Sequence, residues 1–171
     1  INYQHLNEID NESHQFNAVV DGNDKLIETL KSSVRAPEEL ALKKHAKVMF
    51  VKNNFDMGYI NGSLGEVIGF EEDDKQGILP KVKLTDGTTL LVEPETWSIE
   101  NEAGKAIASF QQIPLRLAWA ITIHKSQGLT LEKVIIDAER SFAPGQVYVA
   151  LSRCVSLDGL YLKSGINGRN I

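Results

Sequence analysis

Residues 117–131 read LAWAITIHKSQGLTL, and residues 145–160 read GQVYVALSRCVSLDGL. In both stretches apolar residues recur at helical spacing, and a glycine marks one end of the apolar pattern. Beside each stretch lies a short apolar run typical of a buried strand. Helices that alternate with buried strands indicate a parallel α/β layer. The sequence therefore predicts helices at 117–127 and 145–153, and strands at 134–137 and 160–163.

The middle of the chain has a different pattern. From residue 48 to about residue 113, short β-rich runs alternate with turn signals, and Asp86-Gly87 between two such runs is the sharpest hairpin signal. This region predicts a small antiparallel barrel or meander inserted in the α/β domain. Residues 1–35 carry little pattern apart from a predicted helix at 24–32, where Leu26, Ile27 and Leu30 share one face.

Composition limits the protein classes without choosing a function. A chain of 171 residues with 42% hydrophobic and 24% charged residues fits one folded domain, or one domain with a small insertion. The net charge of −5 argues mildly against a stand-alone nucleic-acid binder, although a local basic patch remains open. With Cys154 as its single cysteine and no secretory signal or apolar run of membrane-spanning length, the chain is expected in a reducing cytosol, or at a bacterial nucleoid, and not in a membrane.

Short polar donors gather at the end of the first stretch. Thr122, His124, Lys125 and Ser126 offer hydroxyl, imidazole and ammonium groups that suit phosphate contacts, which carry no base information. The simpler alternative is a solvated helix end with serine and glutamine as caps. Trp119 and Tyr148 could stack on bases, but aromatic residues in apolar helices more often belong to the core.

The two quoted stretches resemble motifs V and VI of superfamily 1 DNA helicases, most closely the Pif-type and RecD-type enzymes of the 5′-to-3′ branch. Residues 36–54, APEELALKKHAKVMFVKNN, and residues 60–67, INGSLGEV, are similar to that family's run into an inserted SH3-like barrel. The resemblance covers roughly residues 36–163. It implies an α/β fold in which residues 1–47 and 114–171 form a RecA-like second motor domain, and residues 48–113 form an inserted SH3-like β-barrel.

The same resemblance implies roles for single residues. It places Thr122, His124, Lys125 and Ser126 on single-stranded DNA. It brings Gln127 and Gly128 near the nucleotide, with Gly128 open to the alternative of a helix C′ residue. Gln146 is expected to reach the nucleotide or a backbone group. It makes Arg153 the motif VI arginine, a catalytic residue that reaches a γ-phosphate held by the partner RecA-like domain. The alternative for Arg153 is a surface arginine at a helix end.

The chain contains no G-x-x-x-x-G-K-[ST] phosphate loop. We therefore expect ATP and Mg²⁺ to be held mainly by a missing N-terminal RecA-like domain, and the 171 residues to be inactive alone. The apolar run 67–70 followed by acids at 71–74 imitates a Walker B element, but a solvated hairpin turn fits better. No metal-ligand spacing occurs among the histidines and cysteine. A rival hypothesis is a non-enzymatic β-barrel module that binds protein or single-stranded nucleic acid.

Overall fold

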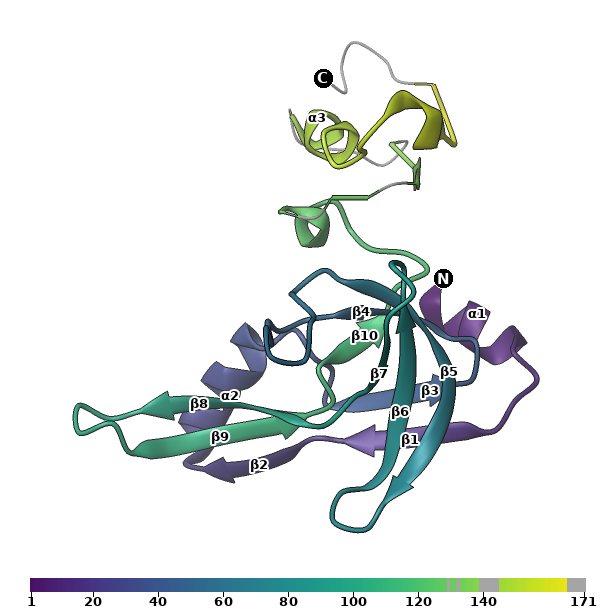
Figure 1. The fold of residues 1–171 in the computed structure, drawn as a ribbon. Helices are drawn as coiled ribbons and strands as arrows, with labels where there is room; N and C mark the ends of the chain where they lie inside the picture. Colours follow the sequence, from purple (N-terminus) through teal and green to yellow (C-terminus); the bar gives the residue numbers. More distant parts are fainter. Residues whose placement is uncertain (129, 132, 139–144, 166–171) are drawn as a thin grey trace. The chain divides into compact units, whose positions relative to one another are not determined.

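A computed structural model describes residues 1–128, 130–131, 133–138 and 145–165. The chain divides into two compact units, residues 1–120 and residues 121–171 (Figure 1). The boundary between the units lies after residue 120. Residues 1–47 contribute helices and strands to the first unit. The assignment of residues 1–47 and 114–171 to one motor domain stays a prediction.

The first unit is built mainly from antiparallel sheet. Its central sheet has the order β10-β4-β5-β6-β7, beside a three-stranded sheet β2-β9-β8 and a pair β1-β3. The elements are α1 (Asn2–Glu8), β1 (Ser13–Asn17), β2 (Val19–Gly22), α2 (Asp24–Ser33), β3 (Glu39–Lys43), β4 (Lys47–Phe50), β5 (Leu64–Asp73), β6 (Gly77–Leu84), β7 (Thr89–Leu91), β8 (Glu95–Glu100), β9 (Ala106–Gln112) and β10 (Leu115–Leu117).

Local sequence signals explain several of these elements. Asn23 caps α2 by accepting a hydrogen bond from the Lys25 N–H at 3.0 Å, and Leu30 of the same helix packs against Phe110. The helix predicted at 24–32 is confirmed. The hairpin predicted at Asp86-Gly87 is also confirmed, because β6 and β7 pair across it and Gly87 has a φ of +93°. The acids at 71–74 lie where β5 turns into β6, as the hairpin interpretation expected.

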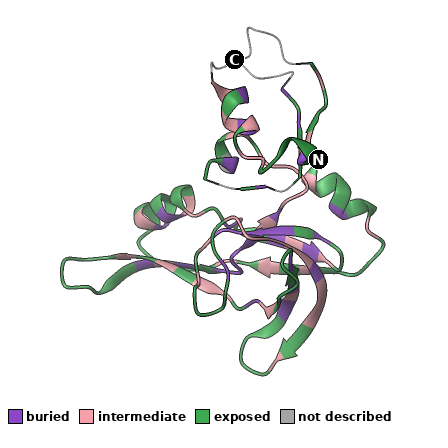
Figure 2. Ribbon diagram, turned by 45° about the horizontal axis from the view of Figure 1, so that its top comes forward, coloured by how far each residue is buried: buried purple, intermediate pink, exposed green. Residues whose placement is uncertain are grey.

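The main core of the first unit lies against its central sheet. Strands β3, β4 and β10 contribute fully buried side chains, and Figure 2 shows this concentration of buried residues on the strands, while α1 and α2 are largely exposed. Leu42, Val48, Phe50 and Leu115 have no measurable exposed area. Burial of side chains of this size stabilises the folded state by roughly 1.5–3 kcal/mol each.

Two side-chain amides tie the beginning of the first unit to its end. The Nε2 of buried Gln112 lies 3.0 Å from each of the carbonyl oxygens of Phe16, Pro37 and Glu38, and shares its two hydrogens among them. The Nδ2 of Asn2 donates to the Ala120 carbonyl at 2.8 Å, while its Oδ1 accepts from the Ala120 N–H at 2.7 Å. These bonds fix the N-terminal segment against the strands that precede residue 121.

The second unit contains η1 (His124–Ser126), β11 (Val134–Ile136), α3 (Gln146–Leu151), η2 (Leu157–Gly159) and β12 (Leu160–Leu162). Strands β11 and β12 pair in parallel, as the sequence predicted. Val147 and Ala150 of α3 pack with Ile136 and Ala138. None of the helices in the described ranges is long and apolar enough to cross a membrane.

The helix predicted at 117–127 is wrong. Leu117 ends strand β10, which pairs with β4, and only one 3-10 turn forms before Gly128. Leu115 and Leu117 enter the core as alternate residues of a strand. The following residues include β-branched Ile121, Thr122 and Ile123, which resist helix formation. The helix predicted at 145–153 is present but shorter, from Gln146 to Leu151.

A partly buried carboxylate fastens the loop between β4 and β5 to strand β8. Glu95 accepts hydrogen bonds from the Lys52 ammonium at 3.0 Å, the Asn54 amide at 2.7 Å and the Tyr59 hydroxyl at 2.9 Å. Burial by itself would raise the pKa of Glu95, but the bonds from Asn54, Lys52 and Tyr59 outweigh it and lower that pKa. Burial, reinforced by Glu95, raises the pKa of Tyr59, so its hydroxyl stays protonated and donates.

We predict that Glu95→Gln lowers the free energy of unfolding by roughly 1–3 kcal/mol, because the amide places N–H groups against the donors Lys52 and Asn54. Chemical denaturation of the 171-residue chain measures this. Since the folded-state pKa of Glu95 is lowered, its stabilisation is present above the ordinary value of 4.5 and is lost as the pH falls through the lowered value. Glu100→Gln, at an exposed position of the same strand, is the matched control. Equal unfolding free energies for the two variants at pH 7 would contradict the prediction.

Candidate nucleic-acid and nucleotide site

The residues expected to contact DNA lie in a tight turn at the start of the second unit. The Ser126 N–H donates to the carbonyls of Thr122 at 3.0 Å and Ile123 at 3.1 Å, which closes the turn. Thr122, His124 and Gln127 are exposed around it. The main chain of Lys125 lies within the turn, and its side chain is outside the described structure. The turn therefore groups the predicted polar residues on one short segment.

Ser126 differs from its neighbours because it points inward. It is only 5% exposed, and its hydroxyl donates to the Ile123 carbonyl at 2.7 Å. That hydroxyl proton stabilises the turn itself, as the capping alternative expected. A phosphate contact by Ser126 stays a prediction, and it requires this one proton to turn from the Ile123 carbonyl to a phosphate oxygen, because phosphate oxygens only accept hydrogen bonds.

Gly128 ends the turn in a left-handed conformation. Its φ is +80°, and it follows Gln127, the C-cap of η1. A Cβ at this position would meet no atom within 4 Å, so the backbone conformation, rather than crowding, requires glycine. The C′ interpretation is confirmed by this geometry, while the approach of Gln127 and Gly128 to a nucleotide stays a prediction.

Main-chain hydrogen bonds connect the two motif-bearing segments. The Leu131 N–H donates to the Arg153 carbonyl at 2.8 Å, and the Val155 N–H donates to the Leu131 carbonyl at 3.0 Å. Leu131 and Cys154 form a parallel bridge. The segment after the HKSQG turn is thus held directly against the residues that follow α3, inside one compact unit.

Arg153 lies just beyond the last turn of α3. Its Nε donates to the Val149 carbonyl at 3.1 Å, and its Nη2 donates to the Ser152 hydroxyl oxygen at 2.9 Å. The surface-arginine alternative predicted such contacts with the helix end. The remaining guanidinium N–H groups have no recorded acceptor among the described residues, so the side chain keeps donors for an external ligand.

The other candidates take different positions. Gln146 is the first residue of α3 and is partly buried. Trp119 packs against the main core of the first unit and stacks on His5, which confirms the core interpretation. For Tyr148 that interpretation is wrong, because its side chain is 68% exposed on the outer face of α3. Helical spacing in so short a helix could not distinguish its inner face from its outer face.

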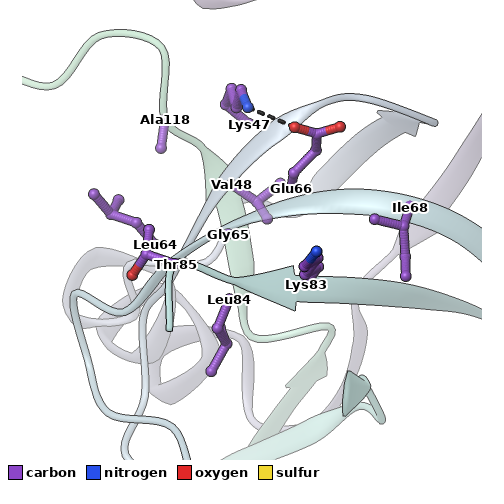
Figure 3. Close-up of a pocket in the computed structure, with 10 residues that line it drawn as sticks. All are labelled: Lys47, Val48, Leu64, Gly65, Glu66, Ile68, Lys83, Leu84, Thr85 and Ala118. Atoms are coloured by element: carbon purple, nitrogen blue, oxygen red, sulfur yellow. Dashed lines mark hydrogen bonds and ion pairs between the residues drawn. The ribbon is translucent and has the colours of Figure 1, made fainter. Parts of the chain in front are cut away.

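A pocket in the first unit contains none of the predicted site residues. It has a volume of about 530 Å³ and lies over β4, β5 and β6 (Figure 3). Lys47 binds Glu66 across it with an Nζ–Oε2 distance of 2.5 Å, and His45 contacts the other carboxylate oxygen of Glu66. Lys47 and then His45 lower the pKa of Glu66. Glu66 therefore stays ionised and paired with Lys47 and His45, so the carboxylate that lines this pocket already has partners.

Sequence reasoning missed the surroundings of Arg153. The sequence places Ser152 directly before it and Val149 one helical turn earlier. This spacing can be read from the sequence, but it does not indicate that the Val149 carbonyl accepts hydrogen bonds from the side chains of Ser152 and Arg153. This depends on how the last turn of α3 ends, which only the structure shows.

Comparison with known proteins identifies relatives of both units. The family model for the 2B domain of the DNA helicase Pif1 matches residues 25–70. The ATP-dependent DNA helicase Pif1 of Psychrobacter sp. (strain PRwf-1) is 41% identical, and the alignment covers 95% of this chain and 32% of that protein. The chain thus spans about a third of this relative's length.

Solved structures agree with these sequence matches. Unliganded Pif1 from Bacteroides sp. has a TM-score of 0.82 at 36% identity, over 99% of this chain and 38% of that one. Bacteroides Pif1 in complex with ADP-AlF3 and single-stranded DNA has a TM-score of 0.74 at 37% identity, with the same coverage. These likenesses support an α/β helicase fold across nearly the whole chain.

We predict that Gly128→Ala destabilises the turn by about 1 kcal/mol, because an alanine there must adopt a left-handed conformation. Amide hydrogen exchange of residues 121–131 measures the change, and exchange several-fold faster is expected. Gly128→Asn should fall between the two, since asparagine tolerates this conformation better. Gly69→Ala is the control, because its Cβ would also meet open space but its φ is not positive. An unchanged exchange rate in Gly128→Ala would refute the backbone explanation.

Proposed function

Because this chain belongs to the Pif1 family and corresponds to the C-terminal portion of a Pif1-type superfamily 1B helicase, we propose that it serves in a longer ATP-dependent 5′-to-3′ DNA helicase. In that protein it supplies contacts to single-stranded DNA and an arginine to an ATP site shared with an N-terminal RecA-like domain. The observation that carries the proposal is the main-chain link between Leu131 and Arg153, which holds both motif segments in one compact unit.

The site residues fit part of a nucleotide site. Arg153 has donors left for phosphoryl oxygens, and a planar guanidinium suits charge spread over such a group. The chain has no phosphate loop, so we propose that ATP and Mg²⁺ are bound mainly by the N-terminal domain. Gln127, Gly128 and Gln146 are proposed to approach the nucleotide beside Arg153.

We propose that the turn at 122–128 grips DNA through its phosphates. A motor that moves over any sequence needs contacts that carry no base information, and Thr122, His124 and Lys125 are polar groups of that type. Bacteroides Pif1, which was solved with single-stranded DNA, supports this ligand. We also propose that residues 48–113 form the inserted SH3-like barrel, and that the whole protein acts in the cytosol or at the nucleoid.

Arg153 provides the test of the proposed function. We predict that Arg153→Ala in the full-length protein lowers kcat for ATP hydrolysis on the order of 10³-fold, because the arginine stabilises charge on the transferring phosphoryl group. Arg153→Lys should rescue poorly, since a point charge cannot reproduce the planar fork. Steady-state ATPase assays measure both, and a thermal melt checks that the variants are folded. Near-normal turnover of Arg153→Ala would reject the shared ATP site.

Lys125 tests the DNA-binding half of the proposal. We predict that Lys125→Ala in the full-length protein weakens binding to all single strands alike and reduces the slope of log K against log salt by about 0.7. Fluorescence anisotropy with oligonucleotides of different base composition, at several salt concentrations, measures this. Lys133→Ala, at an exposed position of the same unit outside the turn, is the control. A changed base preference with an unchanged salt slope would argue against a phosphate contact.

A further inference from the structure

The last turn of α3 leaves one main-chain carbonyl without its usual partner. In a continuing α-helix the Val149 carbonyl would accept from the Arg153 N–H. Here the Arg153 N–H donates to Ala150 at 3.2 Å, and the Cys154 N–H donates to Leu151 at 3.2 Å. The helix therefore tightens as it ends, and the Val149 carbonyl becomes one of the orphan acceptors found at helix C-termini.

Two side chains donate hydrogen bonds to the Val149 carbonyl. The Ser152 hydroxyl donates to the Val149 carbonyl at 2.9 Å, and the Arg153 Nε donates to the same oxygen at 3.1 Å. The Ser152 oxygen in turn accepts from the Arg153 Nη2 at 2.9 Å. Carbonyl, hydroxyl and guanidinium thus form a closed cluster in which each group bonds to the other two. The hydroxyl uses its one proton and one of its lone pairs, as serine chemistry allows.

The cluster holds one edge of the guanidinium and leaves the other available. Both bonds use the Nε and Nη2 side, while the two Nη1 hydrogens and the second Nη2 hydrogen have no acceptor among the described residues. A long arginine side chain that is free to rotate loses entropy when it meets a ligand. Two hydrogen bonds that fix its plane beforehand reduce that loss, which is the advantage of a preorganised site.

We propose that Ser152 is a positioning residue for Arg153: anchored on the Val149 carbonyl, its hydroxyl oxygen accepts from Nη2 and holds the guanidinium ready for the transferring phosphoryl group. This inference rests on the proposed function, since it gives Arg153 its role at the shared ATP site. Ser152 touches neither nucleotide nor DNA in this account, and its effect passes entirely through Arg153.

Ser152→Ala in the full-length helicase tests the inference. We expect kcat for ATP hydrolysis to fall about 10-fold, as for the loss of one hydrogen bond to a charged group, while KM for ATP changes little. Affinity for ADP with aluminium fluoride should fall by a similar factor, and affinity for ADP alone should not. Ser152→Thr should retain most activity, because a threonine hydroxyl can also bond a carbonyl three residues earlier in a helix.

Controls separate positioning from a purely structural role. Ser156→Ala removes an exposed hydroxyl that makes no recorded hydrogen bond among the described residues, and should leave turnover unchanged. If Ser152 acts through Arg153, the double variant Ser152→Ala, Arg153→Ala should be no slower than Arg153→Ala alone. Full turnover in folded Ser152→Ala, or an additive loss in the double variant, would overturn the inference. Normal turnover in Arg153→Ala would instead reject the proposed function.

Discussion

The side-chain amide of Gln112 is the contact on which the first unit depends. Its Nε2 serves the carbonyls of Phe16, Pro37 and Glu38, and its Oε1 accepts the Ile113 N–H at 2.8 Å. Gln112 is itself buried, so its amide would cost roughly 1–3 kcal/mol if it were left without these partners. Because the donor side is taken by carbonyls and the acceptor side by an N–H, only one orientation of the amide satisfies all partners. The amide thereby fastens the segment at residues 16–38 to the end of β9, in addition to the main-chain pairing of β2 with β9.

The sequence predicted those parts of the fold that depend on interactions between residues close together in the chain. The apolar face of Leu26, Ile27 and Leu30 predicted α2, and Asp86-Gly87 predicted a hairpin, because both signals act within a few residues. Strand β2 left no such signal. All four of its residues are exposed, so it carries no alternating pattern, and it forms by pairing with β9 far along the chain. The same non-local pairing explains why Leu117 ended a strand rather than beginning a helix.

The sequence proposed which residues form the candidate site, but not their geometry. The resemblance singled out residues 122–128 and Arg153, but it could not show that residues 124–126 form a single 3-10 turn, that Ser126 bonds inward or that Tyr148 points outward. Those directions follow from a single 3-10 turn and from a helix of six residues, where helical periodicity is too short to define a face. The contacts of Arg153 depend on the way α3 ends, and apolar spacing carries no information about helix ends of that kind.

The pairing of Asn2 with Ala120 gives the first unit an unusual boundary. Its two ends are hydrogen-bonded to each other although the whole unit lies between them in sequence. One asparagine side chain thus satisfies both main-chain groups of Ala120, the last residue of the unit. Local unfolding that releases Asn2 therefore also frees the main chain of Ala120, so the opening of helix α1 is coupled to that of the residues just before the second unit.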